Sequence, residues 1–285
     1  MPAHILDGRA LAAELRVGVA ARSASLRARG IAPTLAVVLV GDDPESAAYL
    51  RGIKRIAQHV GVDVAEHTLP GSVAETEVRA RLTALGQDDA VHGVLLQQPL
   101  PRSLSIRAIA DAVPSRKDVD GAHPSNQGRL AFGTGAPFIP ATPAAVMLLL
   151  ERSARWPLRG CEAVVVGRSA VVGLPVALLL LGRDATVTIV HRSTLDVAAH
   201  LRRADVVVAA AGRPGLVTGD MLKRGATVID VGTTVVASHT VGDVDAASAM
   251  EVAGEITPVP GGVGPVTNVA LMQNVLSAAE RLSSR

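Results

Sequence analysis

Aromatic side chains are almost absent from this sequence of 285 residues. They make up 1% of the chain, and Tyr49 is its single tyrosine. A protein that stacks nucleic-acid bases along a groove needs aromatic side chains for that contact, so this class is not expected. Hydrophobic residues still make up 48% of the chain, which excludes a disordered protein and predicts an aliphatic core.

Cysteine and lysine are also scarce. The single cysteine, Cys161, excludes an intramolecular disulfide and a metal site with several cysteines, and it fits a reducing compartment. The eight histidines are scattered without an H-x-x-x-H pair, so the sequence predicts no metal site. The lysines are Lys54, Lys117 and Lys223, so a reaction step that requires a lysine has three candidates.

Charge of one sign is not concentrated anywhere in the chain. The 28 basic and 26 acidic residues give a formal net charge of +2, without a long run of like charges. The sequence therefore predicts neither a nucleic-acid partner nor a membrane partner. The apolar run 171–181 is interrupted by Gly173 and Pro175 and is too short to span a bilayer, and the first residues do not resemble a signal peptide. We expect a soluble, cytoplasmic protein.

The sequence does contain a regular alternation of short aliphatic runs with longer helical patterns. In the first half, strands are predicted at 35–40, 63–69 and 93–98, and helices at 8–29, 46–60 and 74–85. The stretch 117–143 is rich in Pro, Gly, Asn and Asp and should not hold regular structure for long. From Thr142 onward, strands are predicted at 163–167, 186–191, 205–212 and 227–232, with a closing helix at 268–282. The pattern predicts two α/β domains with a boundary near residue 140.

A glycine-containing turn in the second half has the features of a nucleotide site. Gly167 ends a predicted strand, and Gly173 opens the next predicted helix. Glycines at these places let backbone N–H groups approach a phosphate, and the helix N-terminus favours negative charge. The spacing is G-x5-G-x-P rather than the usual G-x-G-x-x-G, so a glycine turn without a ligand remains the alternative.

The end of the second strand of this half bears on cofactor choice. An NAD site places an acidic residue there to bind the ribose hydroxyls, whereas this strand ends in His191, Arg192, Ser193 and Thr194. A cation with hydroxyls suits a 2′-phosphate, so the sequence favours NADP over NAD, with Arg168 as a second contact. The alternative is that Arg192 is a solvated loop residue.

Six motifs carry a resemblance to a known family. In chain order they are VGDDPESAAYL (40–50), LLQQPLP (95–101), KDVDGAHPSNQGRL (117–130), GRSAVVGLP (167–175), ADVVVAAAGRPGLVTGDMLKRGATVIDVG (204–232) and TPVPGGVGPVT (257–267). Together they closely resemble the methylenetetrahydrofolate dehydrogenase/methenyltetrahydrofolate cyclohydrolase family, and the match spans nearly the whole chain.

The resemblance implies an α/β fold with two α/β domains, the second a Rossmann-like doubly wound parallel sheet, and a cleft between them. It implies a folate-binding catalytic domain at 1–139, onto which the C-terminal helix 268–285 packs, and an NADP-binding domain at 140–267. The implied reaction is NADP-linked oxidation of 5,10-methylenetetrahydrofolate to the methenyl form, followed in most members by hydrolysis to 10-formyltetrahydrofolate. The implied partners are tetrahydrofolate one-carbon derivatives and, in a homodimer, a second copy of the chain.

The resemblance also assigns site residues. Tyr49 matches a tyrosine that lies against the folate ring, Gln97 a glutamine of a V-Q-L-P-L motif, and Asp120 an aspartate that holds the pterin edge. The backbone turn beside the substrate corresponds to Gly261, Gly262 and Pro265. The positions implied for cofactor contact are Gly167, Arg168, Ser169, Gly173, Arg192, Ser193 and Thr233. The purely structural alternatives are that Asp120 is a turn residue before glycine and that Tyr49 is a packing residue.

One departure from the family pattern concerns catalysis. The family has a lysine four residues after the tyrosine, and this lysine drives the cyclohydrolase step. In this sequence Ile53 occupies that position, and Lys54 follows it. On a helix, i+4 lies about 40° from residue i, whereas i+5 lies about 140° away, so Lys54 should point away from Tyr49 unless the helix contains a π-bulge.

Three functions therefore remain open. The first is an NADP-dependent methylenetetrahydrofolate dehydrogenase with weak or absent cyclohydrolase activity, because isoleucine cannot transfer protons. The second is a fully bifunctional enzyme in which a local distortion brings Lys54 into use. The third is a catalytically silent protein that binds NADP or folate, which the intact motifs around Asp120 and Gly261 disfavour.

Overall fold

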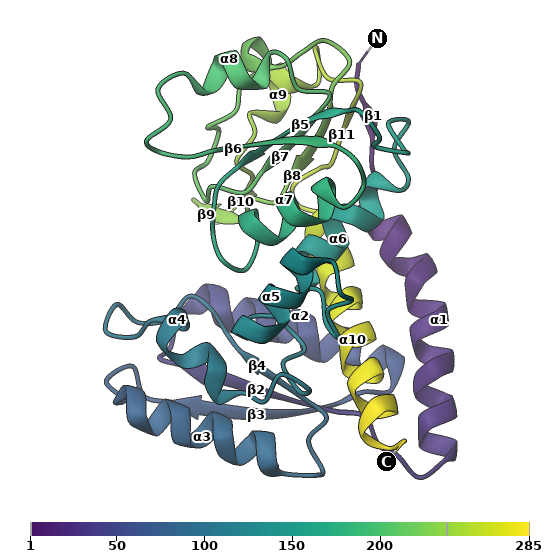
Figure 1. The fold of residues 1–285 in the computed structure, drawn as a ribbon, viewed down its shortest axis with the longest axis vertical. Helices are drawn as coiled ribbons and strands as arrows, with labels where there is room; N and C mark the ends of the chain where they lie inside the picture. Colours follow the sequence, from purple (N-terminus) through teal and green to yellow (C-terminus); the bar gives the residue numbers. More distant parts are fainter. Residues whose placement is uncertain (1, 238, 285) are drawn as a thin grey trace. The chain divides into compact units, whose positions relative to one another are not determined.

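The computed structural model describes residues 2–237 and 239–284, which form two compact units. One unit contains a six-stranded sheet and comprises the chain up to Ala13 together with Thr142–Thr267. The other contains a three-stranded sheet and comprises Glu14–Ala141 together with the chain from Asn268 onward. Two long helices, α1 (Gly8–Ala28) and α10 (Val263–Leu282), each contribute residues to both units (Figure 1).

The three-stranded unit is built on a parallel sheet with β2 at its centre. Its strands are β2 (Thr34–Val40), β3 (Asp63–Leu69) and β4 (Gly93–Leu96), in the order β3-β2-β4. Its further helices are α2 (Pro44–Val60), α3 (Glu75–Gln87), α4 (Ile106–Ile109), η1 (Ala110–Ala112) and α5 (Pro124–Phe132). Leu35, Ala36, Val37 and Val38 of β2 have no exposed surface, as expected for a continuous aliphatic run in the middle of a parallel sheet.

The six-stranded unit is also a parallel sheet, with the order β1-β11-β8-β7-β5-β6. Its strands are β1 (His4–Ile5), β5 (Glu162–Val166), β6 (Thr186–Val190), β7 (Val206–Ala209), β8 (Thr227–Asp230) and β11 (Glu255–Ile256). Its other elements are α6 (Ala141–Leu150), α7 (Gly173–Leu181), α8 (Val197–Leu201), η2 (Gly219–Met221), α9 (Ala246–Ala249) and the antiparallel hairpin β9 (Thr234–Val236) with β10 (His239–Val241).

The chain winds outward from β5 in both directions. It first adds β6 on one side, and then β7, β8 and β11 on the other. This reversal of strand order creates a switch point beside the carboxyl end of β5, which is the usual ligand-binding place of an open parallel sheet. The structure thus confirms two α/β units, of which the second in chain order has a Rossmann-like doubly wound parallel sheet.

Three features of the fold differ from the expectations. The segment before Ala13 was assigned to the first domain, but His4 pairs with Glu255, and this segment belongs to the six-stranded unit. The supposedly irregular stretch contains the nine-residue α5, where Pro124 opens the helix and the His123 Nδ1 atom accepts a hydrogen bond from the Ser125 N–H at 2.9 Å. Helix α10 begins at Val263, five residues earlier than expected.

Within the described part of the chain, no helix is both long enough and apolar enough to cross a membrane.

Candidate functional site

The carboxyl ends of β2 and β4 bring polar residues together in the three-stranded unit. After β2 the chain turns at Gly41, and the Asp43 carboxylate caps α2 by accepting a hydrogen bond from the Ser46 N–H at 2.7 Å. Tyr49 lies in the second turn of this helix. Gln97 follows β4 directly, is buried, and donates a side-chain hydrogen bond to the Gln98 carbonyl oxygen at 2.7 Å.

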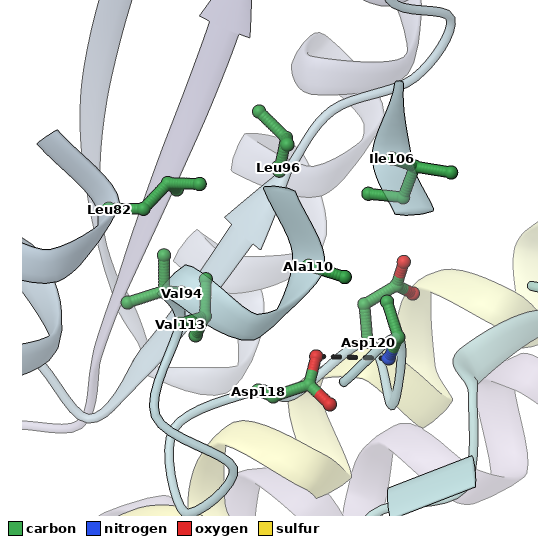
Figure 2. A pocket seen from close by; sticks show the side chains of 9 residues that line it. Leu82, Val94, Leu96, Ile106, Ala110, Val113, Asp118 and Asp120 are labelled. Atoms are coloured by element: carbon green, nitrogen blue, oxygen red, sulfur yellow. Dashed lines mark hydrogen bonds between the residues drawn. The ribbon is translucent and has the colours of Figure 1, made fainter. Parts of the chain in front are cut away.

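Asp118 fixes the loop that carries Asp120. The buried Asp118 carboxylate accepts hydrogen bonds from the backbone N–H groups of Ala122 at 3.0 Å and His123 at 2.8 Å, and from the Asn126 Nδ2 atom at 2.7 Å. Burial raises the pKa of Asp118, and these three hydrogen bonds oppose that effect. Asp118 and Asp120 line a small cavity of about 10 Å³, whose other side chains are aliphatic. Figure 2 shows the two carboxyl groups among these side chains.

Tyr49 and Asp120 interact electrostatically. Burial, and secondarily the charge of Asp118, raise the pKa of the Asp120 carboxyl to about 7. Burial also raises the pKa of the Tyr49 hydroxyl well above its usual value, and the nearby Asp120 adds to this shift. The site therefore offers a neutral phenol beside a carboxyl group that changes charge near neutral pH. A flat ring with an amide edge could bind against the phenol and donate hydrogen bonds to the carboxylate.

The face of α2 that carries Tyr49 presents no basic group at the i+4 position. Helix α2 is α-helical at every residue from Pro44 to Val60, and the Ile53 side chain is fully buried. The Lys54 Nζ atom lies 2.5 Å from Glu66 Oε2 on β3, and this hydrogen bond lowers the pKa of Glu66.

The two remaining lysines also have partners. The Lys117 side chain is buried, and its Nζ atom donates to the Asp88 carbonyl oxygen at 2.6 Å. In the six-stranded unit, the Lys223 Nζ atom lies 2.7 Å from Asp205 Oδ1. Each lysine of the chain is therefore bound to an oxygen atom of the protein.

The glycine-rich turn after β11 lies in the six-stranded unit. A Cβ atom on Gly262 would lie 2.6 Å from the Pro258 carbonyl oxygen, and Gly261 has a φ of 118°, so both positions require glycine. Pro265 follows in the first turn of α10. These three residues thus form the entry into a helix, and they belong to a different unit from Tyr49 and Asp120.

A large cavity opens at the switch point of the six-stranded sheet. Its volume is about 560 Å³, and its walls come from the turns that follow β5, β6 and β7. It is lined by Val166, Gly167, Arg168, Ser169, His191, Arg192, Thr194, Val197, Ala210, Ala211, Arg213 and Leu216. A cavity of this size and position can hold a nucleotide.

Two glycines shape the first wall. Gly167 has a φ of 125°, and a Cβ atom on it would lie 2.2 Å from the Ala210 carbonyl oxygen. A Cβ atom on Gly173 would lie 2.4 Å from the Gly167 carbonyl oxygen. The Ser169 hydroxyl accepts hydrogen bonds from the N–H groups of Val172 and Gly173, both at 3.2 Å, at the start of α7. The two glycines therefore allow the turn after β5 to pack tightly against its own backbone and that of Ala210.

Positive charge surrounds this cavity. In the turn after β6, the His191 N–H donates to the Thr194 hydroxyl at 3.0 Å, and the Ser193 N–H donates to His191 Nδ1 at 3.2 Å. This arrangement presents Arg192 at the rim. The guanidinium groups of Arg168, Arg192 and Arg213 have no hydrogen bond or ion pair with any other described residue.

The cavity contains part of the predicted cofactor set. Its lining includes Gly167, Arg168, Ser169 and Arg192. Gly173 does not line it but packs closely against the backbone of Gly167. Ser193 and Thr233 are exposed and are not among the described residues that line it. The wall formed by Ala210, Ala211, Arg213 and Leu216 was missed, although a glycine-containing turn after a predicted strand was a usable signal.

Comparisons with known proteins identify a family for both halves of the chain. The family profile described as "Tetrahydrofolate dehydrogenase/cyclohydrolase, catalytic domain" matches residues 6–120. The profile described as "Tetrahydrofolate dehydrogenase/cyclohydrolase, NAD(P)-binding domain" matches residues 140–283. A protein of Chloroflexus aggregans named "Bifunctional protein FolD" is 53% identical over 280 residues, which cover 98% of each chain.

Solved structures show the same similarity. The bifunctional FolD methylenetetrahydrofolate dehydrogenase/cyclohydrolase of Campylobacter jejuni superposes with a TM-score of 0.93 at 39% identity, covering 97% of this chain and 98% of that one. The corresponding Trypanosoma brucei enzyme, described as complexed with NADP cofactor and an inhibitor, superposes with a TM-score of 0.94 at 38% identity, covering 100% and 99%.

Proposed function

Because this chain belongs to the tetrahydrofolate dehydrogenase/cyclohydrolase family, we propose that it oxidises 5,10-methylenetetrahydrofolate to 5,10-methenyltetrahydrofolate with NADP and hydrolyses the product weakly or not at all. The chain is an oxidoreductase of one-carbon folate chemistry, as its relatives are. The observation that carries the finer proposal is the pair Ile53 and Lys54: an inert side chain four residues after Tyr49, and a lysine held elsewhere.

The cavity in the six-stranded unit fits NADP. The glycines in its first wall let backbone N–H groups approach phosphates, and its unpaired arginines can neutralise the phosphate charge. Arg192 and Arg168 are the residues that would hold the 2′-phosphate, which brings a charge of about −1.5 to −2. The Trypanosoma brucei relative, which was solved with NADP, supports this choice. When bound, the nicotinamide supplies the acceptor for a hydride from the substrate carbon.

The three-stranded unit, which matches the family's catalytic domain, would hold the folate. The Asp120 carboxylate would accept hydrogen bonds from the amide edge of the pterin ring, and Tyr49 would lie against its face. The buried Gln97 and the anchored Asp118 would keep this end of the sheet rigid. For hydride transfer these residues need only hold the methylene carbon about 3–3.5 Å from the acceptor, which is a positioning task.

Hydrolysis of the methenyl product makes a different demand. Water must be added to the methenyl carbon, and a nearby group must take up and return a proton. Ile53 has no proton to exchange. Lys54 would have to leave Glu66 and cross the helix to replace the missing group, and the continuous hydrogen bonding of α2 opposes that movement. The methenyl compound is therefore the expected product.

The oxidation assay separates this proposal from its alternatives. Purified protein would receive methylenetetrahydrofolate and NADP, and the absorbances of reduced nicotinamide and methenyltetrahydrofolate would be followed together. Equal accumulation of both compounds supports the proposal. Reduced nicotinamide without methenyl accumulation supports a bifunctional enzyme that uses Lys54, and the absence of both signals supports a silent binding protein.

The proposal includes a homodimer, which the family resemblance implies, and a cytoplasmic location, which the single cysteine favours. Light scattering on the purified chain tests the dimer, because a monomer at assay concentrations would contradict it.

A further inference from the structure

The third wall of the nucleotide cavity is the turn after β7, and backbone N–H groups of this turn donate to a protein carboxylate instead of pointing into the cavity. In the turn after β7, three successive N–H groups donate to the carboxylate of Asp243: Ala211 at 2.5 Å, Gly212 at 2.9 Å and Arg213 at 2.8 Å. Backbone N–H groups in such a turn are the usual donors to a phosphate. Here a buried protein carboxylate already uses them, so phosphate recognition by this wall can come only from a side chain.

Arg213 is that side chain. It is exposed, it lines the cavity, and its guanidinium has no partner among the described residues. Arg168 follows β5, Arg192 follows β6 and Arg213 follows β7, so three consecutive strands of the sheet each supply one arginine to the same cavity. Three cations without internal partners match a dinucleotide that carries a pyrophosphate and a further phosphate monoester.

Asp243 is itself rigidly held. It has no exposed surface, and its own N–H donates to Asp230 Oδ1 at 2.9 Å. Asp230 also accepts hydrogen bonds from the N–H groups of Gly232 at 2.9 Å and Val244 at 3.0 Å. The two carboxylates therefore form a chain of contacts that runs from the end of β8 to the cavity wall.

Two glycines make this packing possible. A Cβ atom on Gly242 would lie 1.8 Å from Asp230 Oδ2, and a Cβ atom on Gly232 would lie 2.5 Å from Asp243 Oδ1. Any other residue at either position would displace a carboxylate. Gly232 and Gly242 thus leave the space that the carboxylates of Asp230 and Asp243 occupy.

We propose that Arg213 is a third phosphate-binding cation of the nucleotide cavity and that Asp243 is the positioning residue that holds it there. The inference rests on the proposed function, because the phosphates are those of NADP. Arg213 contributes affinity by contact. Asp243, which touches no ligand, contributes by fixing the three N–H groups and with them the start of the Arg213 side chain.

Arg213 is tested by direct binding. Calorimetry of NADP binding to the full-length apo protein should show affinity about tenfold weaker in Arg213→Gln, and a smaller loss in Arg213→Lys. Arg224→Gln is the matched control, because Arg224 is an exposed arginine of the same unit that does not line the cavity. If Arg213→Gln and Arg224→Gln bind NADP equally well, the inference is wrong.

The same titrations with NAD identify the phosphate. If Arg213→Gln weakens NADP binding and leaves NAD binding unchanged, Arg213 contacts the 2′-phosphate. If it weakens the binding of both dinucleotides, Arg213 contacts the pyrophosphate. Both results support a phosphate contact.

For Asp243, the test is whether the Asp243→Asn variant binds NADP more tightly or more weakly than the wild-type protein. Asp243→Asn removes a negative charge beside a cavity for an anion, so Coulomb's law alone predicts tighter NADP binding. A positioning role predicts weaker binding, by about fivefold or more, with the KM for methylenetetrahydrofolate unchanged. Asp245→Asn is the control, because it removes the same charge two residues later, where Asp245 only caps α9. Unchanged or tighter binding by Asp243→Asn would rule out the positioning role.

Hydrogen exchange adds a readout that needs no variant to fold. The amides of Ala211, Gly212 and Arg213 lie in an otherwise exposed turn, and the contact with Asp243 predicts slow exchange in the wild-type apo protein. Fast exchange of these amides would contradict the anchoring. If the wild-type protein fails to bind NADP, the proposed function is wrong; if it binds and the variants bind equally well, the inference alone is wrong.

Discussion

The Nζ atom of Lys54 lies 2.5 Å from Glu66 Oε2, and this ion pair keeps the lysine on the side of α2 that faces β3. The pair is partly exposed, so it is worth about 0.2–1 kcal/mol. That is a small free energy. The geometry of the helix matters more, because it places residues i and i+5 on different faces and so keeps Lys54 away from the face of Tyr49.

Replacing Ile53 with lysine should introduce hydrolysis. The Ile53→Lys variant places an amine about 40° from Tyr49 on α2, where a proton-transferring group can reach the substrate. Because Ile53 is fully buried, the variant should also lose about 3 kcal/mol of stability. The decay of added methenyltetrahydrofolate and the Tm measure the two effects. Ile53→Met is the control, which should keep the wild-type rate of decay. A folded lysine variant that hydrolyses no faster would show that position 53 was wrongly assigned.

Removing Lys54 should change neither reaction. The Lys54→Gln variant loses the contact with Glu66, and its stability should fall by about 0.2–1 kcal/mol because the pair is exposed. Dehydrogenase and residual hydrolase rates should both stay within twofold of wild type. Loss of a measurable hydrolase rate would mean that Lys54 takes part in the reaction.

Binding of the folate substrate should weaken below neutral pH. The pKa of Asp120 is about 7, so at pH 6 its carboxyl is mostly protonated and accepts fewer hydrogen bonds from the pterin edge. The KM for methylenetetrahydrofolate should rise about tenfold between pH 8 and pH 6. In Asp120→Asn the KM should be high at both pH values. A wild-type KM independent of pH would remove Asp120 from the binding site.

The Asp120 carboxyl should also make the folding stability of the protein depend on pH, with higher stability at low pH. Its pKa is 3.8 when unperturbed and about 7 in the folded protein. Its contribution to stability is therefore full below pH 3.8 and is lost as the pH rises through 7. Asp120→Asn should stabilise the ligand-free protein more at pH 8 than at pH 5, by about 2 kcal/mol. Urea unfolding at both pH values measures this, with the exposed Asp89→Asn as control. An equal effect at both pH values would contradict the raised pKa.

Adding one methyl group at Gly173 should disrupt the nucleotide cavity. In Gly173→Ala the new Cβ atom would lie 2.4 Å from the Gly167 carbonyl oxygen, so the phosphate turn must move. NADP affinity should fall at least tenfold, measured by calorimetry. Gly182→Ala, at the other end of α7, is the control because its Cβ atom would meet its neighbours at an ordinary 3.5 Å. Unchanged NADP affinity in Gly173→Ala would mean that the turn does not hold the phosphates.

The strands with continuous aliphatic runs were predictable from sequence because their burial on both faces leaves a plain pattern. β2 is such a strand, and it was predicted to within one residue. β3 was predicted with its observed bounds although only its last residue, Leu69, is buried. The two-residue strand β1 was not predictable, because its pairing depends on a partner about 250 residues away and not on its own composition. Helix α5 was missed because its Pro and Gly content outweighed two valid start signals, His123 and Pro124.

The candidate functional residues divide in a similar way. Tyr49 and Asp120 belong to motifs that can be recognised in the linear sequence, and Arg192 was predicted from its place at the end of a predicted strand. The proposed role of Asp243 depends on a contact across 30 to 32 residues, and that contact exists only after β7 and β10 have been brought together. Arg213 was missed for a related reason: its place at the cavity depends on the hydrogen bond from its backbone N–H to Asp243, which the linear sequence does not show.

The two helices shared between the units have a consequence for synthesis of the protein. β1, made among the first residues, has to wait for β11 before it can pair. The three-stranded unit waits longer, because its buried residues Leu271 and Leu276 lie on α10, near the end of the chain. The three-stranded unit therefore cannot finish folding on the ribosome while α10 is still unmade. An early stop or a ribosomal stall after residue 260 would leave the six-stranded sheet with all of its strands but the three-stranded unit without its last helix.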